Sequence, residues 1–265
     1  MEIMDGEVAI AAAEAGAAVV HSRYGAVLAR VEKSGGDFAT AADLEAEQAI
    51  LDVIRVARPD DAVLGEEGGR TGPAGAERTW LVDPLCGTVN FAARTPLVAV
   101  NVALRTGSDP TVAAVADPFA GEMFWTDSGP AQVRRDGVDE PLTPSAESRL
   151  VDVNLDPPFP NGPTFRAVRL LGHPEFEAQF RPRVVSTSLA LSWVAAGRRA
   201  AYVTDGQLWD SVHFAAGVAL CRAVGCVVTG IHGQPLDTGA DGLLVAADHD
   251  THQALLALIQ EQFAG

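Results

Sequence analysis

The chain has 265 residues, and its 48% hydrophobic content, with 6% aromatic residues, is enough to build one large or two smaller globular domains. Nineteen lysines and arginines against 35 aspartates and glutamates give a formal charge of −16, which argues against binding to nucleic acid or to an anionic membrane surface. A small phosphorylated ligand would therefore need a bound cation to reverse the local potential.

The cysteine content and the N-terminus predict a cytoplasmic protein. Three cysteines, Cys86, Cys221 and Cys226, cannot build a disulfide framework, and their odd number favours a reducing compartment. The N-terminus is acidic, and no apolar run reaches the ~20 residues that span a bilayer. We therefore expect neither a secretion signal nor a membrane span.

The first half of the chain predicts helices that cover an antiparallel sheet. Apolar residues at mostly helical spacing predict helices over 7–31 and about 43–56, the second with acids in its first turn, where the helix dipole favours them. The Gly/Pro-rich segment 65–75 predicts a loop. Short apolar runs and period-two alternation predict strands at 62–64, 80–82, 97–104, 112–116, 122–125 and 131–134.

The second half predicts an alternation of strands and helices, which with the first half gives an α/β (α+β) class. The polar stretch near 141–148 places a subdomain boundary there, between parts 1–145 and 146–265. Predicted strands are 150–154, 183–185, 200–203, 227–228 and 243–245, and predicted helices are 165–171, 188–196, 213–224 and a last one from about 251.

The segment 80–91 carries the most specific chemistry. An apolar run ends at Asp83, and Pro84, which has no N–H to donate, is expected to end the strand there. The carbonyl of Leu85 and the hydroxyl of Thr88 follow within six residues. Together with Glu66 these groups offer the hard oxygen ligands that Mg²⁺ requires.

Three segments resemble, in order and spacing, the N-terminal motifs of the inositol monophosphatase family. The similarity continues through Asp117-Pro118, Gly129-Pro-Ala131 and 195–202, and spans about residues 8 to 245. It implies a layered αβαβα sandwich with a two- or three-Mg²⁺ site that hydrolyses small phosphate monoesters, often as a homodimer. The three segments are Asp37-Phe-Ala-Thr40-Ala-Ala-Asp43, Gly65-Glu66-Glu67 and Trp80-Leu-Val-Asp83-Pro-Leu-Cys86-Gly87-Thr88-Val-Asn90-Phe91.

The resemblance also implies roles for individual residues. Glu66, Asp83 and the Leu85 carbonyl would hold the first metal ion. Thr88, paired with Asp43, would orient the attacking water, as two-metal sites require for an in-line displacement. Glu67 would support the loop, and Lys33, the only lysine of the chain, would either pair with Glu67 or be solvated.

The chain departs from the family pattern at the second metal. The family's Asp-Pro-(Ile/Leu)-Asp-Gly-Thr becomes Asp-Pro-Leu-Cys-Gly-Thr, so Cys86 replaces a carboxylate. The C-terminal motif fits in two registers, which place either His213 or Asp210 at the other ligand position. We favour His213, because three extra residues at a helix start would turn its side chains by about 300° and add ~4.5 Å of rise.

The altered site leaves three interpretations open. Thiolate and imidazole suit Zn²⁺ or another transition ion better than Mg²⁺, which predicts a phosphatase with a changed metal preference and with Zn²⁺ or Mn²⁺ at the second site. Alternatively, Cys86 acts as a nucleophile activated by His213. In the third interpretation the chain only binds a ligand. Taken singly, Cys86 is also compatible with a small core residue, and His213 with a surface helix residue.

Substrate contacts are less specific in the sequence. By resemblance, Gly87 and Thr88, together with Ser186 and Thr187, would face the substrate, and Asp205 would lie near the specificity acid. A helix cap and a turn explain the last three residues equally well. The predicted substrate is a small phosphorylated polyol or sugar, or a nucleotide-derived molecule.

Overall fold

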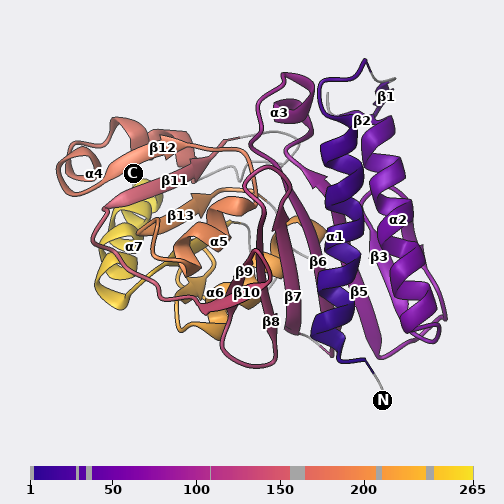
Figure 1. Ribbon diagram of the computed structural model, residues 1–265. Coiled ribbons are helices and arrows are strands. Elements are labelled where there is room, and N and C mark those ends of the chain that lie inside the picture. Colours follow the sequence, from indigo (N-terminus) through magenta and orange to yellow (C-terminus); the bar gives the residue numbers. More distant parts are fainter. Residues whose placement is uncertain are drawn as a thin grey trace.

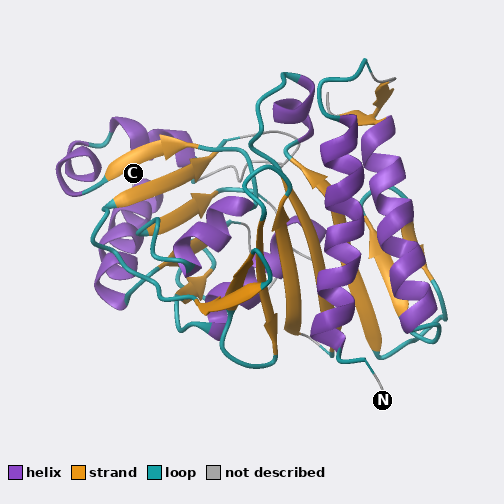
Figure 2. Cartoon of the chain, viewed as in Figure 1, coloured by secondary structure: helices purple, strands orange, loops and turns teal. Residues whose placement is uncertain are grey.

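The computed structural model describes residues 3–27, 30–33, 38–107, 109–155, 165–206, 211–236 and 242–264. Helices and sheets alternate in five layers, with an outer helix pair, a large sheet, an inner helix pair, a smaller sheet and an outer helix (Figure 1). Figure 2 shows the strands of the two sheets as separate orange groups with helices between and outside them. The predicted αβαβα sandwich is confirmed.

The first half builds the outer helix pair and the large sheet. Helices α1 (Asp5–Arg23) and α2 (Ala41–Ala57) pack on one face of eight strands in the order β10-β9-β8-β7-β6-β5-β3-β4. Neighbouring strands are antiparallel except β3 and β5, which are parallel. The strands are β3 (Ala62–Gly65), β4 (Gly69–Thr71), β5 (Arg78–Cys86), β6 (Ala99–Thr106), β7 (Asp109–Asp117), β8 (Glu122–Asp127), β9 (Gln132–Arg135) and β10 (Val138–Pro141).

The second half builds the smaller sheet and the remaining helices. Strands β11 (Leu150–Asn154), β12 (Arg181–Val184), β13 (Ala201–Thr204), β14 (Val227–Thr229) and β15 (Leu243–Ala246) pair in the order β12-β11-β13-β15-β14. Helices α5 (Leu189–Ala195) and α6 (Val212–Ala223) lie between the two sheets. The outer face is covered by η2 (Ala167–Gly172), α4 (Pro174–Gln179) and α7 (His249–Ala264).

Several predicted boundaries are wrong. The first helix ends at Arg23 rather than near residue 31, because Tyr24 is extended and Gly25 takes a left-handed φ of 77°. The chain then forms a short antiparallel pair, β1 (Arg30–Glu32) with β2 (Phe38–Thr40). The predicted loop at 65–75 contains β4, the predicted helix at 165–171 is the 3₁₀ helix η2, and β10 and α4 were not predicted.

Two further predictions concern the chain as a whole. Among the described residues, no helix combines the length and apolarity needed to cross a bilayer. The chain passes from the large sheet to the smaller one between Pro141 and Leu150, and the division into 1–145 and 146–265 stays a prediction. Cys221 and Cys226 are both buried in the core between the sheets.

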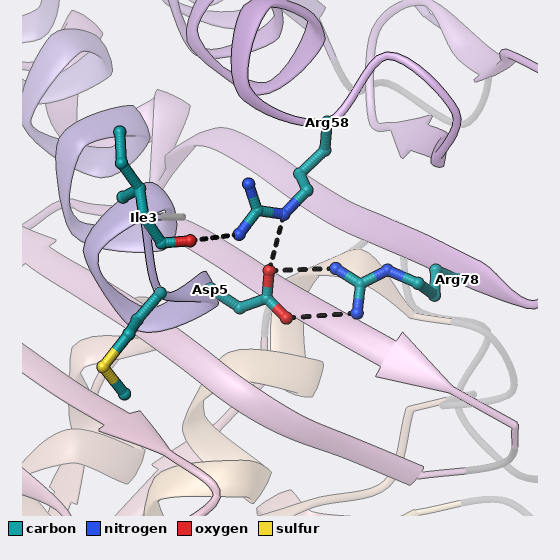
Figure 3. A pocket seen from close by; sticks show the side chains of 5 residues that line it. Ile3, Asp5, Arg58 and Arg78 are labelled. Atoms are coloured by element: carbon teal, nitrogen blue, oxygen red, sulfur yellow. Dashed lines mark hydrogen bonds and ion pairs between the residues drawn. The ribbon is translucent and has the colours of Figure 1, made fainter. Parts of the chain in front are cut away.

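Half-buried acidic groups near the N-terminus are held by arginines. We call Asp5, Arg58, Asp61 and Arg78 the Asp5 network. The Asp5 carboxylate accepts hydrogen bonds from Arg58 and from both terminal nitrogens of Arg78, as Figure 3 shows at the mouth of a cavity of about 510 Å³. Arg78 also binds Asp61 at 2.9 Å, and Arg58 donates to the Ile3 carbonyl. The network ties the start of α1 to the end of α2 and the start of β5.

Candidate active site

The end of strand β5 brings two side chains to the same side of the large sheet. Asp83 pairs with Asn101 and Cys86 pairs with Ala99, so β5 has one residue more than β6 between these pairs. Side chains three positions apart in a regular strand point to opposite faces of the sheet. The extra residue of the bulge reverses this alternation, so Asp83 and Cys86 point to the same face. The expectation that Pro84 ends the strand is therefore wrong, because β5 continues through the bulge to Cys86.

The predicted catalytic pair, Asp43 and Thr88, is in hydrogen-bond contact. The Thr88 hydroxyl lies 3.0 Å from Asp43 Oδ1 and 3.2 Å from the Leu85 carbonyl oxygen. Asp43 is fully buried at the start of α2, where its other oxygen accepts the backbone N–H and the hydroxyl of Thr40 at 2.7 and 2.6 Å. This capping box fixes the carboxylate against rotation. Burial raises the pKa of Asp43 above its ordinary value.

Glu66 lies beside Asp83, and the two carboxylates share a buried position. Burial, followed by the charge of Asp83, raises the pKa of Glu66 to about 8. Lys33 donates to Glu66 at 2.9 Å and to Glu67 at 2.6 Å, so the side chain that was expected to pair with Glu67 or be solvated pairs with both acids. One lysine does not neutralise this set of carboxylates, which favours an additional cation.

Glu47, which the sequence analysis did not single out, holds the loop that carries these acids. Its carboxylate is buried on α2 and accepts the backbone N–H groups of Glu67 at 2.9 Å and Gly68 at 2.7 Å. A side chain at Gly65 would meet a Glu47 oxygen at 2.5 Å, so the glycine makes room for the carboxylate. The signal in the sequence was an acid among the apolar residues on the buried face of α2.

His213 meets the bulge from the first turn of α6. Its Nδ1 lies 2.7 Å from Asp83 Oδ2, and the imidazole also hydrogen-bonds the Cys86 thiol. One ligand atom each of Asp83, Cys86 and His213 lies within 4.8 Å of the others. The alternative ligand, Asp210, lies outside the described residues.

The charges of this cluster balance around His213. Burial alone would lower the pKa of His213, but Asp83 and Cys86 raise it well above its ordinary value. Burial also favours the neutral form of Asp83, yet the neighbouring His213 lowers its pKa below the usual range. Burial and the Asp83 charge raise the pKa of the Cys86 thiol. Asp83 and His213 therefore favour each other's charged forms, while the surroundings of Cys86 favour the neutral thiol.

Polar residues of neighbouring elements support the cluster. Asn101, fully buried on β6, lies 3.5 Å from Asp83 Oδ2 and 2.8 Å from the Ser188 hydroxyl. The Ser188 backbone N–H donates to Cys86 Sγ at 3.3 Å. A buried asparagine in the apolar strand of residues 97–104 was the signal that sequence reasoning missed, because such a side chain needs a partner.

The turn after the bulge requires a glycine. Gly87 has φ of 102°, and a Cβ at this position would lie 2.9 Å from the Leu97 carbonyl oxygen. Asn90, on the short helix α3 (Thr88–Ala92), donates to the carbonyls of Leu97 and Ser186 at 2.9 and 2.8 Å. These contacts tie the turn to the segment before α5.

The other predicted substrate residues are engaged with the protein itself. Thr187 is buried, and its hydroxyl accepts the Leu189 N–H at 3.3 Å. Asp205 is also buried; it accepts the Ala167 N–H at 2.9 Å and pairs with Arg166 at 3.4 Å. These contacts favour structural roles, while the roles of Gly87, Thr88 and Ser186 toward substrate stay predictions.

Comparison with known proteins decides the family. The model described as "Inositol monophosphatase family" matches residues 5–264, almost the whole chain. The chain belongs to the inositol monophosphatase family. With this membership it falls among the phosphoric monoester hydrolases.

Curated relatives and solved structures agree with the family. The chain is 32% identical over 238 residues to "Inositol-1-monophosphatase" of Caulobacter vibrioides, covering 85% of this chain and 88% of that protein. It is 33% identical over 245 residues to "Nus factor SuhB" of Escherichia coli, covering 88% and 86%. The crystal structure of the suppressor protein SuhB from Bartonella henselae superposes with a TM-score of 0.81 at 27% identity, covering 94% and 97%. An IMPase of Thermotoga maritima shares the fold, with a TM-score of 0.81, 22% identity and coverage of 97% of each chain.

The two halves of the candidate centre differ in how they fit the Mg²⁺ ions of the inositol monophosphatase family. Glu66, Asp83 and the Leu85 carbonyl supply oxygens only, and the two adjacent buried carboxylates favour a cation between them, so this half fits Mg²⁺. Asp83, Cys86 and His213 supply one oxygen, one sulfur and one nitrogen. Mg²⁺ binds sulfur and imidazole poorly, so this half does not fit it.

Proposed function

We propose that this protein is a metal-dependent phosphatase that hydrolyses a small phosphorylated polyol or sugar. The observation that carries the proposal is the position of the Thr88 hydroxyl, 3.0 Å from Asp43 Oδ1 and 3.2 Å from the Leu85 carbonyl oxygen. A buried carboxylate, a hydroxyl and a metal-binding set of oxygens meet at one end of β5. This is the arrangement that activation of water for an attack on phosphorus requires.

Asp43 and Thr88 would act together on the water. When the Thr88 hydroxyl donates its hydrogen bond to Asp43, the lone pairs of the Thr88 oxygen can accept a hydrogen bond from the water. As the water attacks phosphorus, its proton passes toward Thr88 and the Thr88 proton toward Asp43. The raised pKa of the buried Asp43 makes it a stronger base than an exposed aspartate.

The remaining residues would bind and position. Glu66, Asp83 and the Leu85 carbonyl would hold the first ion, which when bound supplies Lewis-acid stabilisation of the phosphate charge. Lys33 and Glu47 hold the Glu66–Glu67 segment from two sides, Lys33 through the carboxylates and Glu47 through the backbone. The acid pair therefore has little freedom to rotate.

The substrate class follows from the family and from charge. Relatives carry the name "Inositol-1-monophosphatase", which supports a phosphorylated polyol as substrate here. The chain carries a formal charge of −16, so an anionic substrate depends on the bound cation for its attraction to the site. The substrate panel should include inositol 1-phosphate, sugar phosphates and a nucleotide monophosphate.

Phosphate release from this panel with Mg²⁺ tests the proposal. We expect turnover that requires a divalent ion, and a kcat about 10²–10⁴-fold lower in the variant Asp43→Asn, which keeps the shape of the base but not its charge. Asp52→Asn is the matched control, because Asp52 is an exposed acid on the same helix. Thr88→Ala should lose activity to a similar extent.

Two outcomes would contradict this proposal. One is the absence of phosphate release from every ester with every divalent ion. The other is an Asp43→Asn enzyme as active as the parent, with unfolding curves showing that both are folded.

A second candidate function is covalent catalysis by Cys86. The observation in its favour is the hydrogen bond between His213 and Cys86. His213 in turn contacts Asp83 at 2.7 Å, so hydrogen bonds connect a nucleophile to a base and the base to an orienting acid. The raised pKa of the buried thiol makes this candidate weaker, since the thiolate is the reactive form. Rapid alkylation of Cys86, blocked by substrate, would support it; turnover that is unaffected in Cys86→Asp would contradict it.

Other predictions keep their status. The homodimer implied by the family resemblance, the cytoplasmic location expected from the cysteine content, and the alternative of a protein that only binds its ligand are still to be tested. Light scattering of the purified protein measures its molar mass and so tests the homodimer directly.

A further inference from the structure

We infer that Asp83, Cys86 and His213 form a zinc site that binds Zn²⁺ in preference to Mg²⁺, beside an oxygen-only Mg²⁺ site. The inference rests on the proposed function in one respect, because it assigns an ion to the second metal position of the same centre. Metal binding is measured without turnover, so the two proposals can fail separately.

The first argument is that three side chains from two elements meet at one point. The bulge in β5 brings the side chains of Asp83 and Cys86 to one side of the sheet, and His213, in the first turn of α6, contacts Asp83 there. One ligand atom of each lies within 4.8 Å of the other two, and Nδ1 of His213 lies 2.7 Å from Asp83 Oδ2. Tetrahedral Zn²⁺ holds its ligands at about 2.0–2.3 Å, which separates them by roughly 3.3–3.7 Å. Binding of Zn²⁺ would replace the hydrogen bond between Nδ1 and Oδ2 and widen this spacing by about 0.6 Å.

The second argument is the chemistry of the donors. A sulfur, a nitrogen and an oxygen are a ligand set for zinc, whereas magnesium requires close to six oxygens. Three protein ligands leave the fourth tetrahedral position open, the pattern of catalytic rather than structural zinc. A water or a phosphate oxygen fits that position.

The third argument is support from outside the ligand set. The backbone N–H of Ser188 donates to Cys86 Sγ at 3.3 Å, and Asn101 lies 3.5 Å from Asp83 Oδ2. Ser188 and Asn101 also bind each other at 2.8 Å, so a rigid polar pair holds the sulfur and the carboxylate. Such outer partners orient the ligands of metal sites in proteins.

The position of Asp83 explains why two different ions would occupy one centre. Asp83 contacts both His213 and Glu66, so one carboxylate belongs to both halves. The half with Glu66 and the Leu85 carbonyl is oxygen-only, and the half with Cys86 and His213 is not. The half of the centre on the Glu66 side of Asp83 would therefore prefer Mg²⁺, and the half on the His213 side would prefer Zn²⁺.

Spectroscopic titration of the metal-free protein tests the inference. Co²⁺ is the probe, because cobalt bound to a thiolate gives a charge-transfer band in the near ultraviolet that oxygen ligands do not give. We expect one equivalent of Co²⁺ to produce this band, one equivalent of Zn²⁺ to remove it, and a large excess of Mg²⁺ to leave it unchanged.

Variants identify the ligands. Cys86→Ser should lose the band and weaken Zn²⁺ binding at least about 100-fold, since loss of even an outer partner of a ligand costs 10–100-fold. Cys226→Ala, which removes a different buried thiol, should keep the band. His213→Gln provides a second test should Cys86→Ser fold poorly, and it should weaken Zn²⁺ binding to a similar extent.

The possible outcomes separate the two proposals. A cobalt–thiolate band without phosphate release supports the zinc site and contradicts the phosphatase. Phosphate release with Mg²⁺, but with no band and with Zn²⁺ binding equal in Cys86→Ser and the parent, overturns the zinc site and leaves the phosphatase standing. Displacement of cobalt by an equal concentration of Mg²⁺ also overturns it.

Discussion

Two regions of this protein bury carboxylates, and they neutralise them in different ways. In the Asp5 network two acids meet two arginines, so the charges balance within the protein (Figure 3). In the candidate centre Asp43, Glu47, Glu66, Glu67 and Asp83 are accompanied by one lysine and one histidine. The first arrangement is complete without a ligand, whereas the second has an excess of negative charge that a cation would offset.

The pKa shifts show the same difference. Burial alone would raise the pKa of Asp5, but Arg78 and Arg58 lower it below its ordinary value. Burial and the charge of Asp83 raise the pKa of Glu66 to about 8, although Lys33 is in contact with it. In the Asp5 network the arginines outweigh the effect of burial, whereas at Glu66 burial and the charge of Asp83 outweigh the effect of Lys33 and His213. The contrast separates a structural ion network from a functional site.

The largest expected effect is the loss of the carboxylate that both halves of the candidate centre share. Asp83→Asn should lower phosphate turnover about 10²–10³-fold, the equivalent of the several kcal/mol that a bound metal contributes to the transition state. The free energy of unfolding without metal should also fall, because the pKa of Asp83 is lowered by its buried contact with His213 and an asparagine does not replace that charge.

The control for this variant is Asp5→Asn, which removes an acid of the other region. It should leave turnover per folded molecule unchanged. Equal turnover in Asp83→Asn and the parent would remove the distinction between the two regions. Initial rates at saturating Mg²⁺ measure the turnover, and urea unfolding curves measure the free energy of unfolding.

A smaller effect is expected at Glu47, which contacts the loop rather than the ions. Glu47→Gln leaves one oxygen for two N–H groups, those of Glu67 and Gly68, and this should displace Glu66. We expect Mg²⁺ to bind about 10–100-fold more weakly, as for other partners of metal ligands. Calorimetric titration with Mg²⁺ measures this.

Glu45→Gln is the matched control, since Glu45 is an exposed acid on the same helix that pairs with Arg23. It should bind Mg²⁺ as the parent does. If Glu47→Gln also does so, the Glu66–Glu67 segment is held without Glu47 and the loop contacts are not part of the site.

Glu47 also marks the limit of what the sequence predicts. Apolar periodicity was sufficient for helix α2, whereas the five-layer fold and the pairing of Asp43 with Thr88 were predicted from the resemblance to the inositol monophosphatase family. Glu47 meets partners 20 and 21 residues away, which no local pattern specifies. Its role depends on how α2 packs against the end of β3.

The bulge in β5 shows a second limit. Proline was expected to end the strand, but a strand can pass a residue that lacks an N–H by inserting one unpaired position. The register of β5 against β6 decides this, and register is a tertiary property. The same holds for the end of α1, where pairing of β1 with β2 prevails over an apolar pattern that continues to residue 28.

In the Asp5 network, loss of one arginine should affect stability rather than catalysis. Arg78→Gln leaves Asp61 buried and Asp5 with one partner, which should lower the free energy of unfolding by about 1.5–3 kcal/mol, the usual worth of hydrogen bonds to charged groups. Chemical denaturation measures the change. Arg70→Gln, at an exposed position on β4, should stay within about 0.5 kcal/mol of the parent. A strong loss of turnover in folded Arg78→Gln would show that the two regions are coupled.

The smallest effect, that of pH on Asp5, tests whether the network stabilises through charge. A carboxylate whose pKa is lower in the folded state contributes stability above its unfolded pKa, here the ordinary 3.8, and loses it as pH falls through the folded value. Asp5→Asn should therefore be less stable than the parent by about 0.5–1.5 kcal/mol near neutral pH, and this difference should shrink progressively below about pH 4. Urea unfolding at several pH values measures it, with Glu14→Gln, an exposed acid on the same helix, as the control without a pH-dependent difference. A difference that persists undiminished in acid would mean that Asp5 acts through its shape and packing, since its charge is absent there.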